Sequence, residues 1–145
     1  MLDHIAAVKA LDLPAGTYLV VGGSCLDVRS IRKSDDIDMV VTPETFALLQ
    51  SRGWEIDAPF RQKWGRDRLK HDCFEVYSDM IIESENRFVS AADLIRKAEM
   101  FAEIPFLSLD EFIFFKRENS REKDLADIAL IEEYLRTNTW SDSTS

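Results

Sequence analysis

The chain has 145 residues, of which 46% are hydrophobic and 31% are charged, so its composition predicts one folded domain and excludes a wholly disordered chain. Its formal net charge of −9 at pH 7 opposes non-specific binding to nucleic acid, because such binding depends on Lys and Arg side chains that neutralise phosphates. No apolar run approaches the roughly 20 residues of a membrane-spanning helix, and the first residues lack the layout of a signal peptide; we therefore expect a cytoplasmic protein without a membrane partner.

Predicted helices and strands alternate in the first half of the chain. They are a helix over 3–13, a strand over 17–21, a short helix or turn over 25–32, a strand over 37–41 and a helix over 43–52. The last helix has Thr42 as its N-cap, Pro43 at its first position and Gly53 beyond its end. Two or three further strands are expected between Trp54 and Tyr77, the last of them over 73–77.

Helices dominate the end of the chain. Segment 91–106 fits either one helix or a helix followed by an edge strand. Ser108 and Glu111 form a capping box ahead of an apolar stripe, and another helix is expected over 121–136. Residues 1–136 are therefore expected to form one α+β domain, an α/β sandwich with C-terminal helices, followed by a flexible tail over 137–145.

A basic segment over 61–70 departs from the acidic balance of the chain. It has Arg or Lys at five positions and an acidic residue only at Asp67. Its simplest interpretation is a solvated hairpin with basic side chains on one face. The alternative is a contact with a polyanion, for which we predict weak, salt-sensitive tRNA binding at most.

Asp36 and Asp38 interrupt an otherwise apolar strand. Residues two apart in a strand share a face, so the two carboxylates are expected side by side while Ile37, Met39 and Val41 point into the core. Carboxylates this close repel each other, and their oxygens suit a hard cation such as Mg²⁺. The alternative is that Asp36 belongs to a turn and Asp38 to an exposed face.

Gly22, Gly23 and Ser24 follow the strand over 17–21. Glycines at such a position let backbone N–H groups converge on an anion, and the serine hydroxyl adds a donor, so the triplet is a candidate phosphate loop or else a plain turn. Glu75 lies between two apolar residues of a later strand and is the candidate third carboxylate. Asp72 and Asp79 are its neighbouring alternatives.

The order and spacing of these motifs resemble the nucleotidyltransferase superfamily with the polymerase-beta-type fold. The resemblance rests on the segments Val21-Gly22-Gly23-Ser24, Asp36-Ile37-Asp38 and Phe74-Glu75-Val76. It implies the mixed β-sheet of that fold. It also implies that Asp36, Asp38 and Glu75 are catalytic carboxylates that hold two Mg²⁺ ions. The loop that binds the nucleotide phosphates would consist of Gly22, Gly23 and Ser24.

The C-terminal segment 106–135 resembles small bacterial nucleotidyltransferase-like proteins, including the abortive-infection toxin group. This resemblance implies a toxin-antitoxin context, with Lys116 as a catalytic residue on the nucleotide phosphate and with Lys123 and Asp124 in the nucleotide site. The alternative from the residues alone is a solvated helix surface, with ion pairs one turn apart such as Lys123 with Asp127.

Together the two resemblances imply a magnesium-dependent nucleotidyltransferase. It would move a nucleoside monophosphate from a nucleoside triphosphate to a hydroxyl acceptor on a protein, an RNA or a small molecule, with a partner protein and tRNA as candidate acceptors. The chain lacks the long helical domain that larger members use to grip their acceptor, which leaves these alternatives open. The alternative function is an inactive module of the same fold that binds nucleotide or a partner protein.

Overall fold

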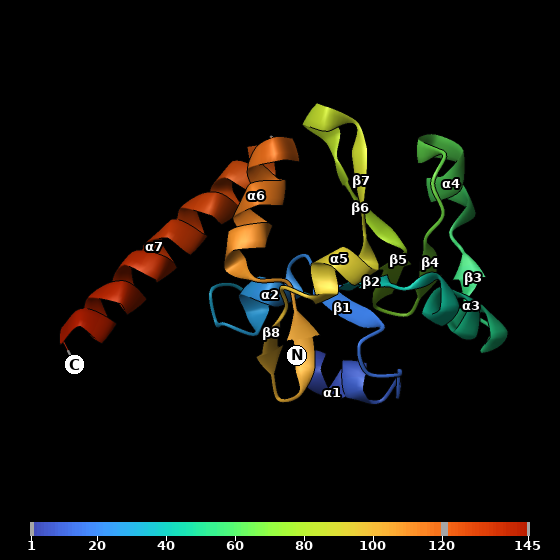
Figure 1. The fold of residues 1–145 in the computed structure, drawn as a ribbon, viewed down its shortest axis with the longest axis horizontal. Coiled ribbons are helices and arrows are strands. Elements are labelled where there is room, and N and C mark those ends of the chain that lie inside the picture. Colours follow the sequence, from blue (N-terminus) through green and yellow to red (C-terminus); the bar gives the residue numbers. More distant parts are fainter. Residues whose placement is uncertain (1, 120–121, 145) are drawn as a thin grey trace.

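The computed structural model describes residues 2–119 and 122–144, apart from the side chains of 83, 122–124 and 138–144, and has a mixed sheet flanked by helices (Figure 1). The strands of the sheet are β1 (Tyr18–Val21), β2 (Ile37–Val41), β3 (Glu55–Ile56), β4 (Leu69–His71), β5 (Phe74–Tyr77), β8 (Glu99–Phe101) and β9 (Ile104–Phe106). Within the described residues their order is β3-β4-β5-β2-β1-β9-β8. The α+β class expected from the sequence is thus confirmed.

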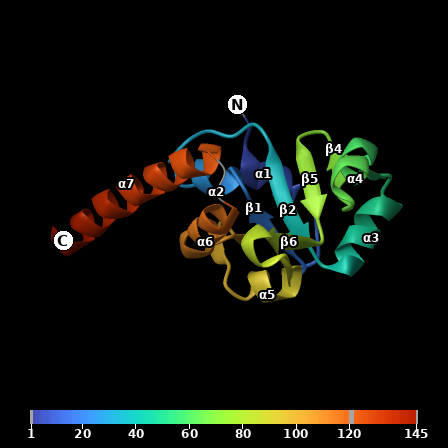
Figure 2. The ribbon, with the colours of Figure 1, turned by 90° about the horizontal axis from the view of Figure 1, so that it is seen from above.

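A second, two-stranded hairpin and the helices complete the described chain. The hairpin strands are β6 (Asp79–Ile82) and β7 (Arg87–Ser90), joined through the 3-10 helix η1 (Glu83–Glu85). The helices are α1 (His4–Lys9), α2 (Ser24–Asp27), α3 (Pro43–Ser51), α4 (Ala58–Trp64), α5 (Ala91–Ile95), α6 (Leu109–Asn119) and α7 (Glu122–Thr144). Seen from above, α1 and α5 lie on opposite sides of the sheet, and α7 projects away from it (Figure 2).

The centre of the sheet is apolar on both faces. Strand β1 is buried at every position, and β2 is buried at every position except Asp38. Continuous apolar strands of this kind form where helices cover both faces of a sheet. Because β2 pairs antiparallel with β1 and parallel with β5, the partly buried Asp38 is set into the middle of the core sheet.

Several predicted elements are confirmed, with small shifts at their ends. Ser108 caps α6, since its hydroxyl accepts a hydrogen bond from the Glu111 N–H at 3.2 Å. The ambiguous segment 91–106 is a helix followed by a β-hairpin, α5 with β8 and β9. Helix α7 continues to Thr144, beyond the expected end at Arg136, while the flexibility expected of 137–145 stays a prediction. Among the described residues no helix combines the length and apolarity needed to span a bilayer.

The hairpin expected for the basic segment is wrong in part. Its first half is the end of α4, which begins after the N-cap Asp57 and ends at Gly65, a residue with φ of 67°. Both are ordinary helix boundary signals. Only the end of the segment enters a strand, β4, which pairs with β3 and β5.

An ion pair ties α7 to the rest of the fold. Asp127 is 7% exposed and accepts hydrogen bonds from the Arg32 guanidinium at 2.8 and 3.0 Å, while the Lys116 Nζ lies 3.6 Å away. Burial alone would raise the pKa of Asp127, but Arg32 and Lys116 outweigh it and hold the pKa below its ordinary value. Asp127 is therefore ionised and structural, and the solvated alternative for this residue is wrong.

Replacing Asp127 by Ala should lower the free energy of unfolding by about 1–3 kcal/mol at neutral pH, because Arg32 and Lys116 lose a buried partner. The stabilisation is lost as pH falls through the depressed pKa of Asp127, so parent and variant converge in acid. Urea unfolding at neutral and acidic pH measures this. The control is Glu132→Ala, which breaks an exposed pair with Arg117 and should cost about 0.5 kcal/mol or less; equal losses in both variants would contradict the assignment.

Candidate functional site

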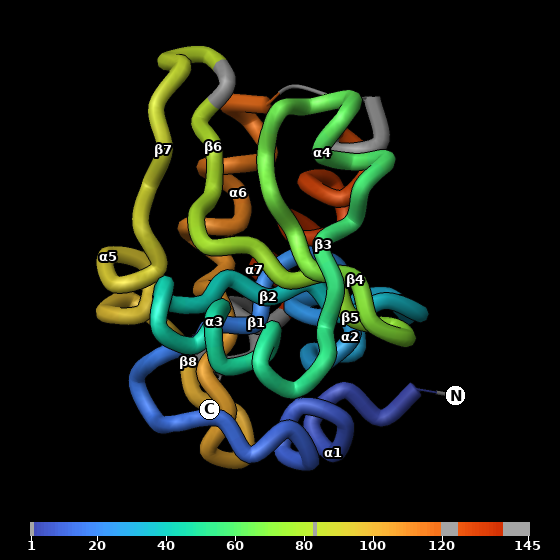
Figure 3. The backbone as a smooth tube through the Cα atoms, turned by 90° about the vertical axis from the view of Figure 1, so that its right-hand side faces the viewer, coloured from blue at the N-terminus to red at the C-terminus, as the bar shows by residue number. Residues whose placement is uncertain are grey.

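A cleft of about 920 Å³ lies at the carboxyl end of β5. Residues of the β6–β7 hairpin, α4 and α6 line it, and the backbone view shows the hairpin beside α4 with α6 behind them (Figure 3). Its lining includes four residues expected in the site from sequence, Gly22, Asp38, Glu75 and Lys116. Segments far apart in the sequence therefore meet around one cavity.

Two carboxylates lie side by side at the base of this cleft. Asp38 on β2 and Glu75 on β5 are paired positions of two parallel strands, and side chains at such positions project on the same face. Burial, followed by the negative charges of Glu75 and Asp36, raises the pKa of Asp38 to about 7. Its Oδ1 atom is buried and has no hydrogen-bond partner among the described residues.

Gly22 lets the backbone approach Asp38. It has φ of 67°, and a Cβ atom at this position would lie 2.5 Å from the Asp38 Oδ2 atom. A side chain here would therefore be strained by the backbone and would collide with the carboxylate. Gly22 thus makes room for a carboxylate, and its expected role on a ligand phosphate stays a prediction.

Glu75 is held by cations from the basic segment. The Arg68 Nη1 atom donates to Glu75 Oε2 at 3.1 Å, and the Lys70 Nζ lies 3.3 Å from Oε1. Arg68 also donates to the Tyr77 hydroxyl at 3.0 Å and to Asp57 Oδ2 at 2.9 Å. Because Asp57 caps α4, Arg68 couples this helix to the carboxylate pair.

Ser24 has partners inside the protein. Its side chain is buried, its Oγ atom lies 2.6 Å from His4 Nδ1, and its hydroxyl donates to the Asp36 carbonyl at 3.3 Å. His4 Nε2 is also 2.9 Å from the Ser34 carbonyl and 3.2 Å from Asp27 Oδ2. This hydroxyl joins α1 to the segment before β2, and a role on phosphate stays a prediction.

Two expected site residues that the structure describes, Asp36 and Gly23, are absent from the cavity lining. Asp36 is exposed just before β2, and Gly23 packs against Ser34, whose Oγ atom would be 2.6 Å from a Cβ atom there. Lys123 and Asp124 fall in α7, and their side chains lie outside the described residues. Among the alternatives for Glu75, Asp79 lines the cleft and Asp72 is an exposed neighbour of His71.

The described residues contain no group of three or more His, Cys, Asp or Glu side chains that could hold a metal ion. The expected triad is therefore represented by the adjacent pair Asp38 and Glu75, with Asp36 outside the cleft. The buried Asp38 oxygen without a partner and the proximity of Glu75 fit a hard cation, which oxygen ligands bind and which would offset their repulsion.

Sequence reasoning missed the aromatic and basic side chains of the cleft. They are Phe60, Trp64, Arg66, Arg68, Tyr77 and Phe88. The signal available was the basic segment itself, whose end forms a short hairpin with β5. Its proximity to Asp38 depends on β5 pairing with β2, and such pairing between separate segments is not a local property of the sequence.

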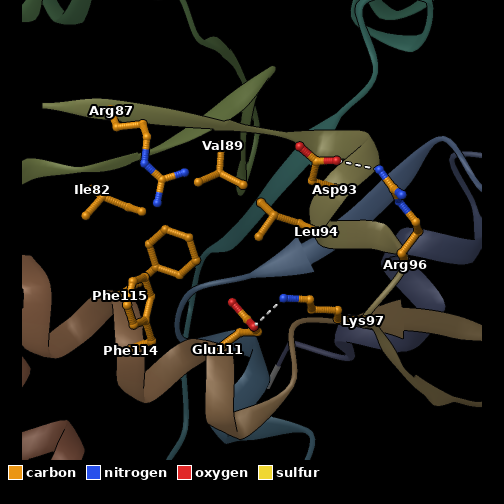
Figure 4. Close-up of a pocket in the computed structure, with 10 residues that line it drawn as sticks. All are labelled: Ile82, Arg87, Val89, Asp93, Leu94, Arg96, Lys97, Glu111, Phe114 and Phe115. Atoms are coloured by element: carbon orange, nitrogen blue, oxygen red, sulfur yellow. Dashed lines mark hydrogen bonds and ion pairs between the residues drawn. The ribbon is translucent and has the colours of Figure 1, made fainter. Parts of the chain in front are cut away.

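A second cavity of about 510 Å³ lies between β7, α5 and α6 (Figure 4). Its apolar floor includes Leu94 and Phe115. The charges at its edge are paired, Arg96 with Asp93 and Lys97 with Glu111 at 3.4 Å. None of the residues expected in the site from sequence lies among its lining residues.

No protein-family model, curated protein sequence or solved structure matches the chain.

Replacing Gly22 by Ala should lower the free energy of unfolding by about 2–4 kcal/mol, because backbone strain adds to the collision with Asp38. Gly65→Ala is the matched control, since Gly65 also has φ of 67° but open space at its Cβ position. It should cost only about 1 kcal/mol. Equal losses in denaturant unfolding would show that the approach to Asp38 is not constrained.

Asp38 should also make stability depend on pH. Its raised pKa means that the folded chain binds this proton more tightly than the unfolded chain, so its contribution to stability falls as pH rises from the ordinary pKa of 3.8 towards about 7. Asp38→Asn removes this titration. The free energy of unfolding of the variant should therefore rise by roughly 1–3 kcal/mol relative to that of the parent across this pH interval. A difference that is constant with pH, in urea unfolding, would contradict the burial of an ionisable carboxyl.

Proposed function

We propose that the chain is a magnesium-dependent nucleotidyltransferase of the polymerase-beta-type fold. It transfers a nucleoside monophosphate from a nucleoside triphosphate to a hydroxyl acceptor, with a partner protein and tRNA as candidates. The observation that carries the proposal is the pairing of Asp38 with Glu75 at the base of a cleft that Gly22 and Lys116 also line. The strand order also supports the proposal, because β2, which carries Asp38, lies between β1, which ends just before Gly22, and β5, which carries Glu75.

The carboxylate pair is suited to hold the metal. Asp38 offers a buried oxygen without a partner among the described residues, and Glu75 is its neighbour on the next strand. Bound magnesium supplies charge neutralisation for the triphosphate and lowers the pKa of the acceptor hydroxyl. The rigid strand β2 fixes the position of Asp38, which favours a preformed site over one assembled on binding.

Other side chains of the cleft have separate roles. Lys116 lines the cavity, with its ammonium group above the Phe112 ring at 5.2 Å and 3.6 Å from Asp127; it would balance charge on the triphosphate while keeping this contact. Arg68 orients Glu75 through its contacts with Asp57 and Tyr77. Such positioning and charge stabilisation are the main demands of phosphoryl and nucleotidyl transfer.

A second candidate function is an inactive module that binds nucleotide or a partner protein. The specific observation in its favour is that Glu75 already has two cationic partners, Arg68 and Lys70, which a metal must displace or share. Binding without transfer is the expected behaviour of this alternative. The toxin-antitoxin context belongs with either function and stays a prediction.

Replacing Asp38 by Asn should abolish magnesium-dependent nucleotide binding, while the metal-free fold should be as stable or more stable because carboxylate repulsion is relieved. Any nucleotidyl transfer should fall about a hundredfold or more. Thermal unfolding of parent and variant, each with and without magnesium and ribonucleoside triphosphates, measures binding. Transfer of label from α-labelled triphosphates, with a cell extract as acceptor source, measures activity.

The matched control is Asp72→Asn, which also removes an acid beside β5 but from an exposed position. It should leave the ligand-induced rise in melting temperature unchanged. If magnesium and triphosphate stabilise the parent and Asp38→Asn equally, or stabilise neither, the proposed metal site is wrong. Binding with no transfer to any acceptor would instead favour the inactive module.

A further inference from the structure

Two large aromatic side chains are exposed at the cleft. Trp64 from α4 is 55% exposed, and Phe88 from β7 is 48% exposed, yet both line the cavity that contains Asp38 and Glu75. They come from two elements whose residues form walls of the cavity, α4 and the β6–β7 hairpin, and the backbone view shows the hairpin beside α4 (Figure 3). Aromatic rings are normally buried, so exposed rings inside a concave site are typical of a surface for a ligand.

Cations hold these rings in a polar setting. The Arg66 guanidinium lies over the Phe88 ring at 5.2 Å and over the Tyr77 ring at 5.8 Å. Arg66 also donates to Asp79 Oδ1 at 2.7 Å, which joins the segment after α4 to the base of the hairpin. The Lys63 ammonium lies 5.1 Å from the Trp64 ring centre. The Lys63 contact lies within α4, whereas the Arg66 contacts connect the end of this helix to the hairpin before a ligand enters.

We propose that Trp64 and Phe88 form a stacking site for the nucleobase of the triphosphate. A flat ring with a π-face stacks on indole and phenyl surfaces, and this interaction accepts any base. The cavity of about 920 Å³ falls within the size range of sites for ligands of this class, roughly 300–1000 Å³. The proposal rests on the proposed function, because the phosphates of the same ligand would extend towards the carboxylate pair.

The lining around the two rings also suits a base. Asn86 and Arg66 line the same cavity as Phe88 and Tyr77, and amide and guanidinium groups donate to the edges of bases. By contrast, the acids Asp38 and Glu75 belong to strands β2 and β5 of the main sheet, and Asp79 lies where the hairpin begins. The cleft thus has an aromatic region on its walls and a carboxylate region at its floor. A nucleotide, which has a ring at one end and phosphates at the other, requires such a division.

The test uses Trp64→Leu and Phe88→Leu, with Phe114→Leu as a matched control. Phe114 is also an exposed ring, but it lines the second cavity. Calorimetry measures the binding of three probes to each protein: ATP with magnesium, inorganic tripolyphosphate with magnesium, and adenosine at millimolar concentration.

We expect Trp64→Leu and Phe88→Leu each to weaken binding of ATP and of adenosine about tenfold. Tripolyphosphate binding should not change, and Phe114→Leu should bind all three probes as the parent does.

The outcomes separate this proposal from the proposed function. Equal affinity of the parent and both wall variants for ATP and adenosine overturns the stacking site, as does a parent that binds neither. Adenosine binding that depends on Trp64 and Phe88, in a parent that does not bind tripolyphosphate, supports the stacking site and contradicts the metal–phosphate site. A further probe, single-stranded oligo(A), identifies the source of the base: if it binds and ATP does not, the site belongs to an acceptor strand and the assignment to the triphosphate is wrong.

Discussion

The arrangement of the cleft depends on keeping two carboxylates next to each other on adjacent core strands. Asp38 and Glu75 are paired positions of β2 and β5, and burial together with their mutual repulsion raises the pKa of Asp38 to about 7. Such a pair is unfavourable unless cations compensate it. Arg68 and Lys70 do so for Glu75, whereas the buried Asp38 oxygen has no partner in the described part of the chain. Among the described residues, the fold thus retains a buried acid with one unsatisfied oxygen beside its cavity.

The surrounding elements adapt to this constraint. Gly22 takes a left-handed conformation so that Asp38 can lie against the end of β1. Arg68 connects Glu75 to the N-cap of α4 through Asp57, so the helix that carries Trp64 is anchored to the carboxylate pair. On the other side, Arg32 and Asp127 fasten α7 beside Lys116. Residues separated by most of the chain are therefore held around one cavity by charge pairs that connect secondary-structure elements.

Local features of the sequence predicted much of this arrangement. The strand around Asp38, the cap at Ser108 and the turn at Gly22 follow from propensity, capping and backbone freedom, which a short segment determines. The partner of Ser24 and the pairing of Glu75 with Asp38 could not be predicted in the same way. Ser24 contacts His4, and β5 pairs with β2, through tertiary packing. The helix α4 was missed although Asp57 and Gly65 mark its ends, because the basic charges between them were interpreted as a solvated hairpin.

A crystal structure with Mn²⁺ in place of magnesium and a non-hydrolysable triphosphate analogue tests the carboxylate pair most directly, because anomalous scattering locates the metal independently of the nucleotide. The account predicts manganese between Asp38 and Glu75, at the oxygen distances of a hard divalent ion, about 2.0–2.2 Å. Manganese at another acidic cluster, or no anomalous peak within the cleft at saturating metal, would contradict it.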